Sequence, residues 1–221
     1  MRVDQPYGRR YAEDSFLEEP KKRYFIACEG RRTEYRYFRG LLEFRDEIGI
    51  HPLIEIIPVM HEKNTGSNPL TIYEEASKVV KTVPNFFPGD QLCIIADRDQ
   101  HSFTEAQYKQ LVDADEKKEI RFCITNPCIE FWLLLHFCDA SEYDRTILRE
   151  NKKTGKRTQT ELYLMDKLGG GYSKRSLHFN LNYKDTVRTA IRNSKNFATD
   201  CMALEHEIGT NLGLLIEAML A

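Results

Sequence analysis

The sequence contains no apolar run of the roughly 18 residues that a membrane-spanning helix requires, so we predict no membrane span and no membrane partner. Its first twenty residues are polar and lack the apolar stretch of a secretory signal. We therefore expect a polar N-terminal arm over 1–22 and a cytoplasmic location.

Residue spacings typical of zinc sites are also missing. Six cysteines are present, but no two form a CxxC pair, and the histidines show no HExxH spacing. Four of the cysteines lie inside apolar runs, at positions 28, 93, 123 and 138. We expect buried free thiols in a reducing compartment, and neither disulfides nor a zinc site.

Charge is unevenly distributed along the chain, although the formal net charge is only −2. Residues 145–195 contain thirteen Lys or Arg and four Asp or Glu, whereas the remainder contains nineteen basic and thirty acidic residues. This asymmetry predicts either a surface that faces a polyanion, joined to a more acidic core, or an ordinary solvated helical face.

The order of apolar runs predicts an α/β fold. We expect strands at 23–28, 53–59, 91–97 and 120–125. Helices are expected at 32–48, at 69–83, at 104–117, and from Asn126 or Pro127 to 137. Such alternation predicts a mainly parallel sheet with helices on both faces.

The C-terminal part has a different pattern. No convincing strand is visible over 139–221, and the Gly-rich GGGY at 169–172 interrupts it. Two helices are predicted, at 183–207 and 210–220. We therefore expect three regions: the arm 1–22, an α/β domain over 23–138, and a basic helical extension over 139–221 that packs on that domain.

Three carboxylates follow two of the predicted strands. Glu29 ends the first strand, and Asp97 and Asp99 end the third. Because ligands gather at the carboxyl ends of parallel strands, and alternation puts both aspartates on one side, the three are expected to meet. Each could instead be a simple strand-ending turn, but together they suit Mg²⁺, or Mn²⁺ in its place, because their repulsion would be costly without a cation.

Three segments of the chain resemble a known family. The stretches CEGRRTEYRYF, IIADRDQ and NPCIEFWLLLHF together resemble the RloB-like family of Toprim-fold proteins. The resemblance covers about 23–138, and NYKDT and TNLGLLIEAM are similar to later family blocks. It implies a Toprim-like sheet with an α-helical extension, and a role in bacterial anti-phage defence by abortive infection.

The resemblance also implies roles for the carboxylates. Asp97 and Asp99 would be magnesium ligands, and Glu29 a general acid/base or a further ligand. Metal-assisted phosphodiester hydrolysis uses groups of these kinds. One departure concerns the residues after Glu29-Gly30, where the family usually has an acidic residue followed by Lys. Here they are Arg31-Arg32, which makes the local field more basic.

Glu130 is a further acidic candidate, on the first turn of an apolar helix. A lone buried carboxylate is costly unless it is paired or binds a ligand. It could interact only with the helix dipole, or it could be a catalytic acid near the metal at the same sheet edge.

Basic residues give candidates for nucleic-acid contact. Helical spacing recurs in the set Lys184, Arg188, Arg192 and Lys195. Arg32 opens the helix after Glu29 and could face phosphate. These residues are either a contact surface for a nucleic-acid backbone or solvated charges.

Two functions remain open from the sequence. The first is a Mg²⁺-dependent nuclease that acts on RNA or DNA. The second is a catalytically silent module that binds nucleic acid or a nucleotide, or acts as a sensor, together with a defence-system protein partner. A homo-oligomer is compatible with either.

Overall fold

The computed structural model describes residues 2–3, 22–30, 32–60, 68–83, 86, 89–98, 103–174 and 177–220. Most of the predicted arm and Asp99 therefore lie outside the described residues. Within them, a six-stranded sheet has the order β1-β3-β2-β4-β5-β8. Its four central strands are parallel, and they are β2 (Lys22–Cys28), β3 (Ile54–Met60), β4 (Gln91–Asp97) and β5 (Arg121–Asn126).

Short antiparallel strands extend the sheet at both edges. They are β1 (Arg2–Val3), which pairs with β3, and β8 (Gly209–Thr210), which pairs with the end of β5. A separate hairpin joins β6 (Lys153–Thr154) to β7 (Arg157–Thr158). The expectation that 139–221 contains no strand is therefore wrong. Strands of two residues carry no alternation pattern, and β8 exists because of a partner more than eighty residues away.

The helices follow the strands in chain order. In the first half they are α1 (Thr33–Glu43), α2 (Arg45–Ile48), α3 (Pro69–Lys81), α4 (Glu105–Glu116) and α5 (Ile129–Leu134). The second half contains α6 (Arg145–Glu150), α7 (Gln159–Lys167), α8 (Phe179–Asn182), η1 (Lys184–Thr186), α9 (Val187–Ser194), α10 (Cys201–Leu204) and α11 (Leu212–Glu217).

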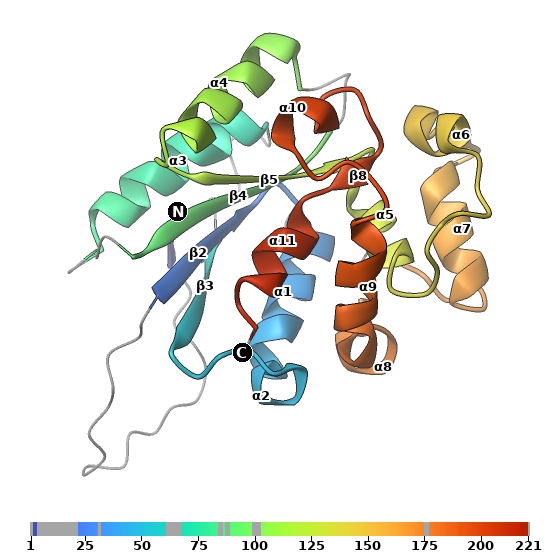
Figure 1. The fold of residues 1–221 in the computed structure, drawn as a ribbon, viewed down its shortest axis with the longest axis horizontal. Helices are drawn as coiled ribbons and strands as arrows, with labels where there is room; N and C mark the ends of the chain where they lie inside the picture. Colours follow the sequence, from blue (N-terminus) through green and yellow to red (C-terminus); the bar gives the residue numbers. More distant parts are fainter. Residues whose placement is uncertain are drawn as a thin grey trace.

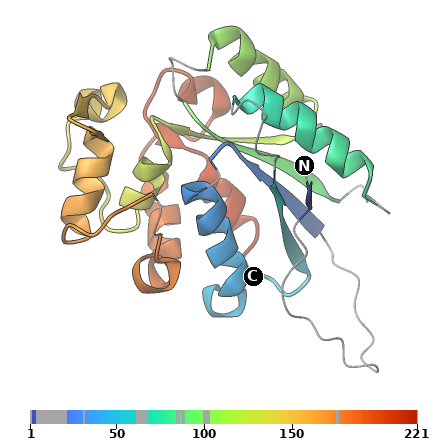
Figure 2. The same ribbon diagram turned by 180° about the vertical axis from the view of Figure 1, so that it is seen from behind.

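Helices cover both faces of the sheet, as Figures 1 and 2 show. Alternation in β2 explains this, because Tyr24, Ile26 and Cys28 join one hydrophobic cluster and Phe25 and Ala27 join the other. One face carries α3, α4 and α10, and the other carries α1, α5, α9 and α11. The α6–α7 pair lies beyond α5 (Figure 1). The predicted α/β class with a helical C-terminal part is confirmed.

Several predicted helices are shorter than expected. The helix at 32–48 is broken at Phe44, whose ring stacks on Phe179 with centroids 6.2 Å apart. Asn126 belongs to β5 and does not start a helix, and α5 begins at Ile129. The expected helix 183–207 is divided into η1, α9 and α10, because residue 198 leaves the helix to bridge β8.

Gly209 allows that bridge to form. Ala198 donates its N–H to the carbonyl of Ile208 at 3.2 Å and accepts from Thr210 N–H at 3.0 Å. A Cβ atom added at position 209 would lie 2.0 Å from the Ala198 carbonyl oxygen. Only glycine permits this approach of two backbones, which fixes the 196–198 segment beside β8.

Two expectations from composition can be compared with the structure. All six cysteines are free thiols, with Cys28, Cys93 and Cys123 buried. In the part of the chain that the structure describes, no helix has the length and apolar character needed to cross a membrane.

Candidate functional site

The carboxyl ends of β2 and β4 bring two predicted acids together. These strands are parallel neighbours, and the residue after β2 continues the pairing, since Glu29 N–H donates to the Ile95 carbonyl at 3.0 Å. The Glu29 carboxylate in turn accepts from the Asp97 N–H at 3.4 Å. Glu29 and Asp97, which are far apart in the chain, therefore lie side by side at one edge of the sheet.

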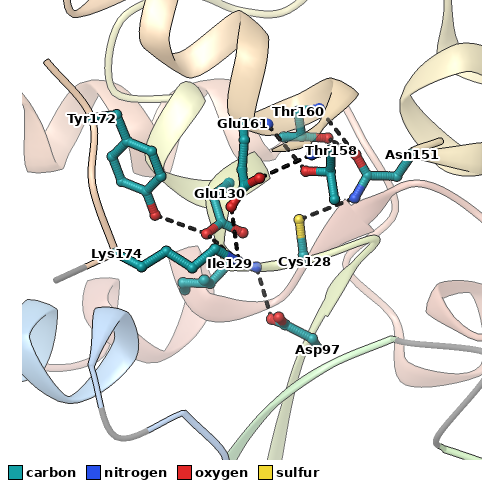
Figure 3. A network of polar contacts seen from close by, with 10 residues as sticks. All are labelled: Asp97, Cys128, Ile129, Glu130, Asn151, Thr158, Thr160, Glu161, Tyr172 and Lys174. Carbon is teal, nitrogen blue, oxygen red and sulfur yellow. Dashed lines mark hydrogen bonds and ion pairs between the residues drawn. The ribbon is translucent and has the colours of Figure 1, made fainter. Parts of the chain in front are cut away.

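Asp97 also connects β4 to the start of α5. Its Oδ1 accepts a hydrogen bond of 2.7 Å from the Ile129 N–H, as Figure 3 shows. The residue in the N-cap position, Cys128, contributes no side-chain hydrogen bond to the helix. Asp97 thus satisfies one of the backbone N–H groups that have no partner within the helix, and this fixes Asp97 close to Glu130.

Glu130 lies at the centre of a polar network. Its side chain is fully buried, and its Oε1 accepts from the Tyr172 hydroxyl at 2.8 Å. The Lys174 ammonium lies 3.0 Å from the same oxygen and 3.1 Å from Glu161 (Figure 3). Among the described residues the other oxygen of Glu130, Oε2, has no hydrogen-bond partner.

Glu161 is held in place by its own helix. It forms a capping box with Thr158 at the start of α7, in which its carboxylate accepts from the Thr158 N–H at 2.9 Å. Lys174 therefore contacts one carboxylate from α5 and one from α7. These contacts join α7 and the segment around Lys174 to α5, which is itself bonded to the end of β4 through Asp97.

Glu34 is an acid of this site that sequence reasoning missed. It lies in the first turn of α1 and is only 6% exposed. Its carboxylate folds back over Gly30, where an added Cβ would lie 2.0 Å from Oε2. The signal was the presence of a second glutamate five residues after Glu29, but a polar residue on a helix next to arginines is usually solvated.

The negative charges of these acids disfavour ionisation of their neighbours. Burial raises the pKa of Asp97 well above its usual value, and the charges of Glu34, Glu130 and Glu29 raise it further. Burial also raises the pKa of Glu34, to which the charge of Glu130 adds, against backbone hydrogen bonds and the charge of Lys174. The four residues Glu29, Glu34, Asp97 and Glu130 are called the carboxylate cluster below.

Lys174 supplies part of the compensating charge. Burial works to lower the pKa of its ammonium, but Glu130 and Glu161 outweigh burial and raise it. Lys174 is therefore protonated at neutral pH. Its contacts leave Asp97 and Glu34 without a direct ion pair among the described residues.

The structure describes two of the three predicted metal ligands, Glu29 and Asp97. Asp99 lies outside the described residues. Among those that are described, no three His, Cys, Asp or Glu side chains form a group that could hold a metal ion. A third ligand for a cation at Glu29 and Asp97 would therefore come from Asp99 or from movement of Glu34 or Glu130.

The predicted nucleic-acid contacts are more dispersed. Arg32 is exposed at the start of α1, between Glu29 and Glu34 in the chain. Lys184 is ion-paired with Glu47 of α2, which places it at the opposite end of α1 from Glu34. Arg188 and Arg192 are exposed on α9, and Lys195 pairs with Glu217 at 2.7 Å. Of the four predicted contacts, only Arg32 lies in the chain between two residues of the cluster, Glu29 and Glu34.

Comparisons with known proteins place the chain in a family. A search of curated proteins finds no match, and neither does a search of solved structures. The family model described as RloB-like protein matches residues 24–219, which includes both the sheet and the helical C-terminal part. The chain belongs to the RloB-like protein family.

Proposed function

We propose that this protein is a divalent-cation-dependent nuclease that hydrolyses phosphodiester bonds in RNA or DNA. The observation that carries the proposal is the carboxylate cluster, in which acids at the end of β2, in the first turns of α1 and α5 and at the end of β4 lie near enough at the carboxyl edge of a parallel sheet for their charges to act on one another. Perturbed acids gathered at such an edge are typical of catalytic sites. A role in anti-phage defence follows from the family resemblance alone.

The donor chemistry fits Mg²⁺ or Mn²⁺. Both cations favour carboxylate oxygens, with water and substrate phosphate completing the coordination. The unpartnered Oε2 of Glu130 and the raised pKa of Asp97 are what a group of acids shows when its compensating charge is incomplete. Asp97 and the predicted ligand Asp99 would hold the cation, with Glu29 beside them. When bound, the cation would offset charge on the phosphodiester and acidify a water molecule.

The chain's own residues have separable tasks in this proposal. Glu29, which is half-buried at the rim, would accept the proton from the attacking water. Glu130, which pairs with Lys174, would lie behind the cation and help to position Asp97 through the start of α5. Arg32 would contact a phosphate of the substrate, because it is exposed at the start of α1.

The deciding experiment compares Asp97→Asn with Asp166→Asn, which removes the same charge from an exposed position of α7. With Mg²⁺ or Mn²⁺ and labelled RNA and DNA, the wild type and Asp166→Asn should cleave, and Asp97→Asn should lose activity by about a hundredfold or more. The cation should raise the melting temperature of the wild type and of Asp166→Asn, but not of Asp97→Asn.

Folding serves as the control for this comparison. Because the pKa of Asp97 is raised in the folded protein, its ionised form costs stability at neutral pH, so Asp97→Asn should melt no lower than the wild type. A wild type that shows neither cleavage nor a cation-dependent melting temperature would end the proposal.

One observation favours the second function, a binding or sensor module. Lys174 already pairs with both Glu130 and Glu161 from within the chain and offsets part of their charge without a metal. Such a module would bind nucleic acid equally well in the wild type and in Asp97→Asn, with no cleavage by either. Gel-shift and cleavage assays on the same samples separate the two functions.

A further inference from the structure

A second polar site lies apart from the carboxylate cluster. A pocket of about 430 Å³ lies between α6 and the segments 196–198 and 207–208, which flank β8. None of the four clustered acids lines it. Because β8 pairs with Thr125 and Asn126 at the end of β5, the side of the pocket next to β8 lies at the carboxyl edge of the sheet.

One wall of the pocket is cationic. Arg145 and Arg149 are four residues apart on α6, so they share one face of the helix, and both are exposed. Neither forms an ion pair with a carboxylate among the described residues, and Glu207 on the opposite wall neutralises neither. Guanidinium groups that are not already paired are suited to bind phosphate, because their planar N–H groups match two phosphate oxygens.

The floor of the pocket is aromatic and rigid. Phe197 is only 8% exposed, and its ring packs edge-to-face on Phe131 with centroids 5.0 Å apart. The Arg145 guanidinium lies 4.8 Å above the same ring and donates to the Asn196 carbonyl at 3.3 Å. Arg145 is thus positioned in advance by the ring and by the carbonyl.

The remaining wall combines an acid with an apolar residue. Glu207 is exposed and Ile208 is buried beside it. A carboxylate here repels a densely charged polyphosphate, but it can accept hydrogen bonds from a ribose hydroxyl or from the amino group of a base. The volume lies in the range of small-ligand pockets, roughly 300–1,000 Å³, and a single nucleotide suits that size.

We propose that this pocket binds one nucleotide unit, with its phosphate on Arg145 and Arg149 and its sugar or base toward Glu207. The unit comes either from a free mononucleotide or from one residue of a single strand. The proposal is independent of the proposed hydrolysis, because the residues that carry it are not those of the carboxylate cluster.

The test is equilibrium binding in EDTA, so that no cation-dependent cleavage occurs. The probes are the four nucleoside monophosphates by calorimetry, and a short fluorescent single-stranded oligonucleotide by anisotropy, with inorganic phosphate as competitor. Arg149→Gln is the main variant, and Arg157→Gln, an exposed arginine on β7, is its matched control. Arg145→Gln and Glu207→Gln test the stacked arginine and the acidic wall.

Arg149→Gln should weaken binding about tenfold, the effect of one charge-assisted hydrogen bond, and Arg157→Gln should change it less than about twofold. If Arg149→Gln weakens the binding of mononucleotides as well as of the oligonucleotide, the ligand is a free nucleotide. If it weakens the binding of the oligonucleotide alone, the ligand is one unit within a strand.

Three outcomes would overturn the proposal. They are no binding of either probe at millimolar concentration, equal binding by the wild type, Arg145→Gln and Arg149→Gln, or competition by inorganic phosphate as strong as that by a mononucleotide. Asp97→Asn should bind as the wild type does, so failure of the proposed hydrolysis leaves this result intact.

Discussion

The two ends of the segment 128–137 bury a titratable side chain in opposite ways. At its start Glu130 is fully buried and lies against the Lys174 ammonium and the Tyr172 hydroxyl. At its end His136 is equally buried, but it lies between two hydroxyl groups, those of Tyr37 at 3.0 Å and Thr186 at 2.9 Å.

The difference is visible in their charge. Burial lowers the pKa of His136 to about 3, so the imidazole is neutral at physiological pH and needs only hydrogen bonds. Glu130 is accompanied by a cation, Lys174, whose pKa is raised by that contact. The neutral His136 therefore joins helices through hydrogen bonds alone, whereas Glu130, which lies near the other acids, has a cation as its partner.

The largest expected effect comes from removing the cation. Lys174→Met leaves the fully buried Glu130 carboxylate with its hydrogen bond from the Tyr172 hydroxyl but without its ion-pair partner. Breaking a buried pair costs about 3–5 kcal/mol, and because the Lys174 side chain is half exposed we expect about 2–4 kcal/mol, measured by urea unfolding at pH 7.

Lys153→Met, which changes an exposed lysine of β6, is the control and should change stability by less than about 0.5 kcal/mol. Adding Glu130→Gln to Lys174→Met should restore most of the loss, because the uncompensated charge disappears. Equal stability of the two lysine variants would show that Glu130 does not depend on Lys174.

The contribution of His136 to the free energy of unfolding should depend on pH. Since the pKa of His136 falls from 6.5 unfolded to about 3 folded, its contribution is complete above pH 6.5 and is lost as the pH falls toward 3. Between pH 7 and pH 5 the loss is about 2 kcal/mol. The groups around the imidazole, Tyr37, Tyr183 and Thr186, do not titrate in this window.

The measurement is urea unfolding of the wild type and of His136→Gln at both pH values. Acids with raised pKa values, such as Asp97 and Glu34, act in the opposite direction in both proteins, so the difference between the two slopes isolates His136. Identical slopes would mean that the imidazole is protonated in the folded protein.

An exposed pair gives the smallest expected effect. Lys195 and Glu217 are 2.7 Å apart, with about half of each side chain exposed. Lys195→Gln should cost less than about 1 kcal/mol, and salt should reduce the effect. A loss as large as that of Lys174→Met would remove the distinction between the buried pair and the surface pair.

Apolar runs explain how much of the fold could be predicted. The strands at 23–28, 91–97 and 120–125 are continuous apolar segments, and the structure places each within about a residue of its predicted bounds. The pairing of Glu29 with Asp97 followed from the parallel topology. Such local patterns are enough to predict the strands, because these strands are central in the sheet and most of their residues are buried.

Other features depend on distant partners and could not be predicted. Phe44 interrupts a helix because it packs on Phe179, and residue 198 leaves a helix because of Gly209. Glu34 was missed because only the folded turn over Gly30 brings it inward. Lys174 was recognised as part of a basic region, yet nothing in the sequence indicates that its ammonium contacts Glu130.

The contact at Gly209 has a consequence for molecular selectivity. Two backbone hydrogen bonds between Ala198 and the chain at 208–210 hold the pocket's floor beside its acidic wall, and there is no room for a side chain at position 209. The separation of floor and wall is therefore set by the backbone, whereas Arg149 on α6, which is exposed, can change rotamer. The backbone-fixed side of the pocket would therefore limit the thickness of a ligand, and the arginine side would accept ligands of different length.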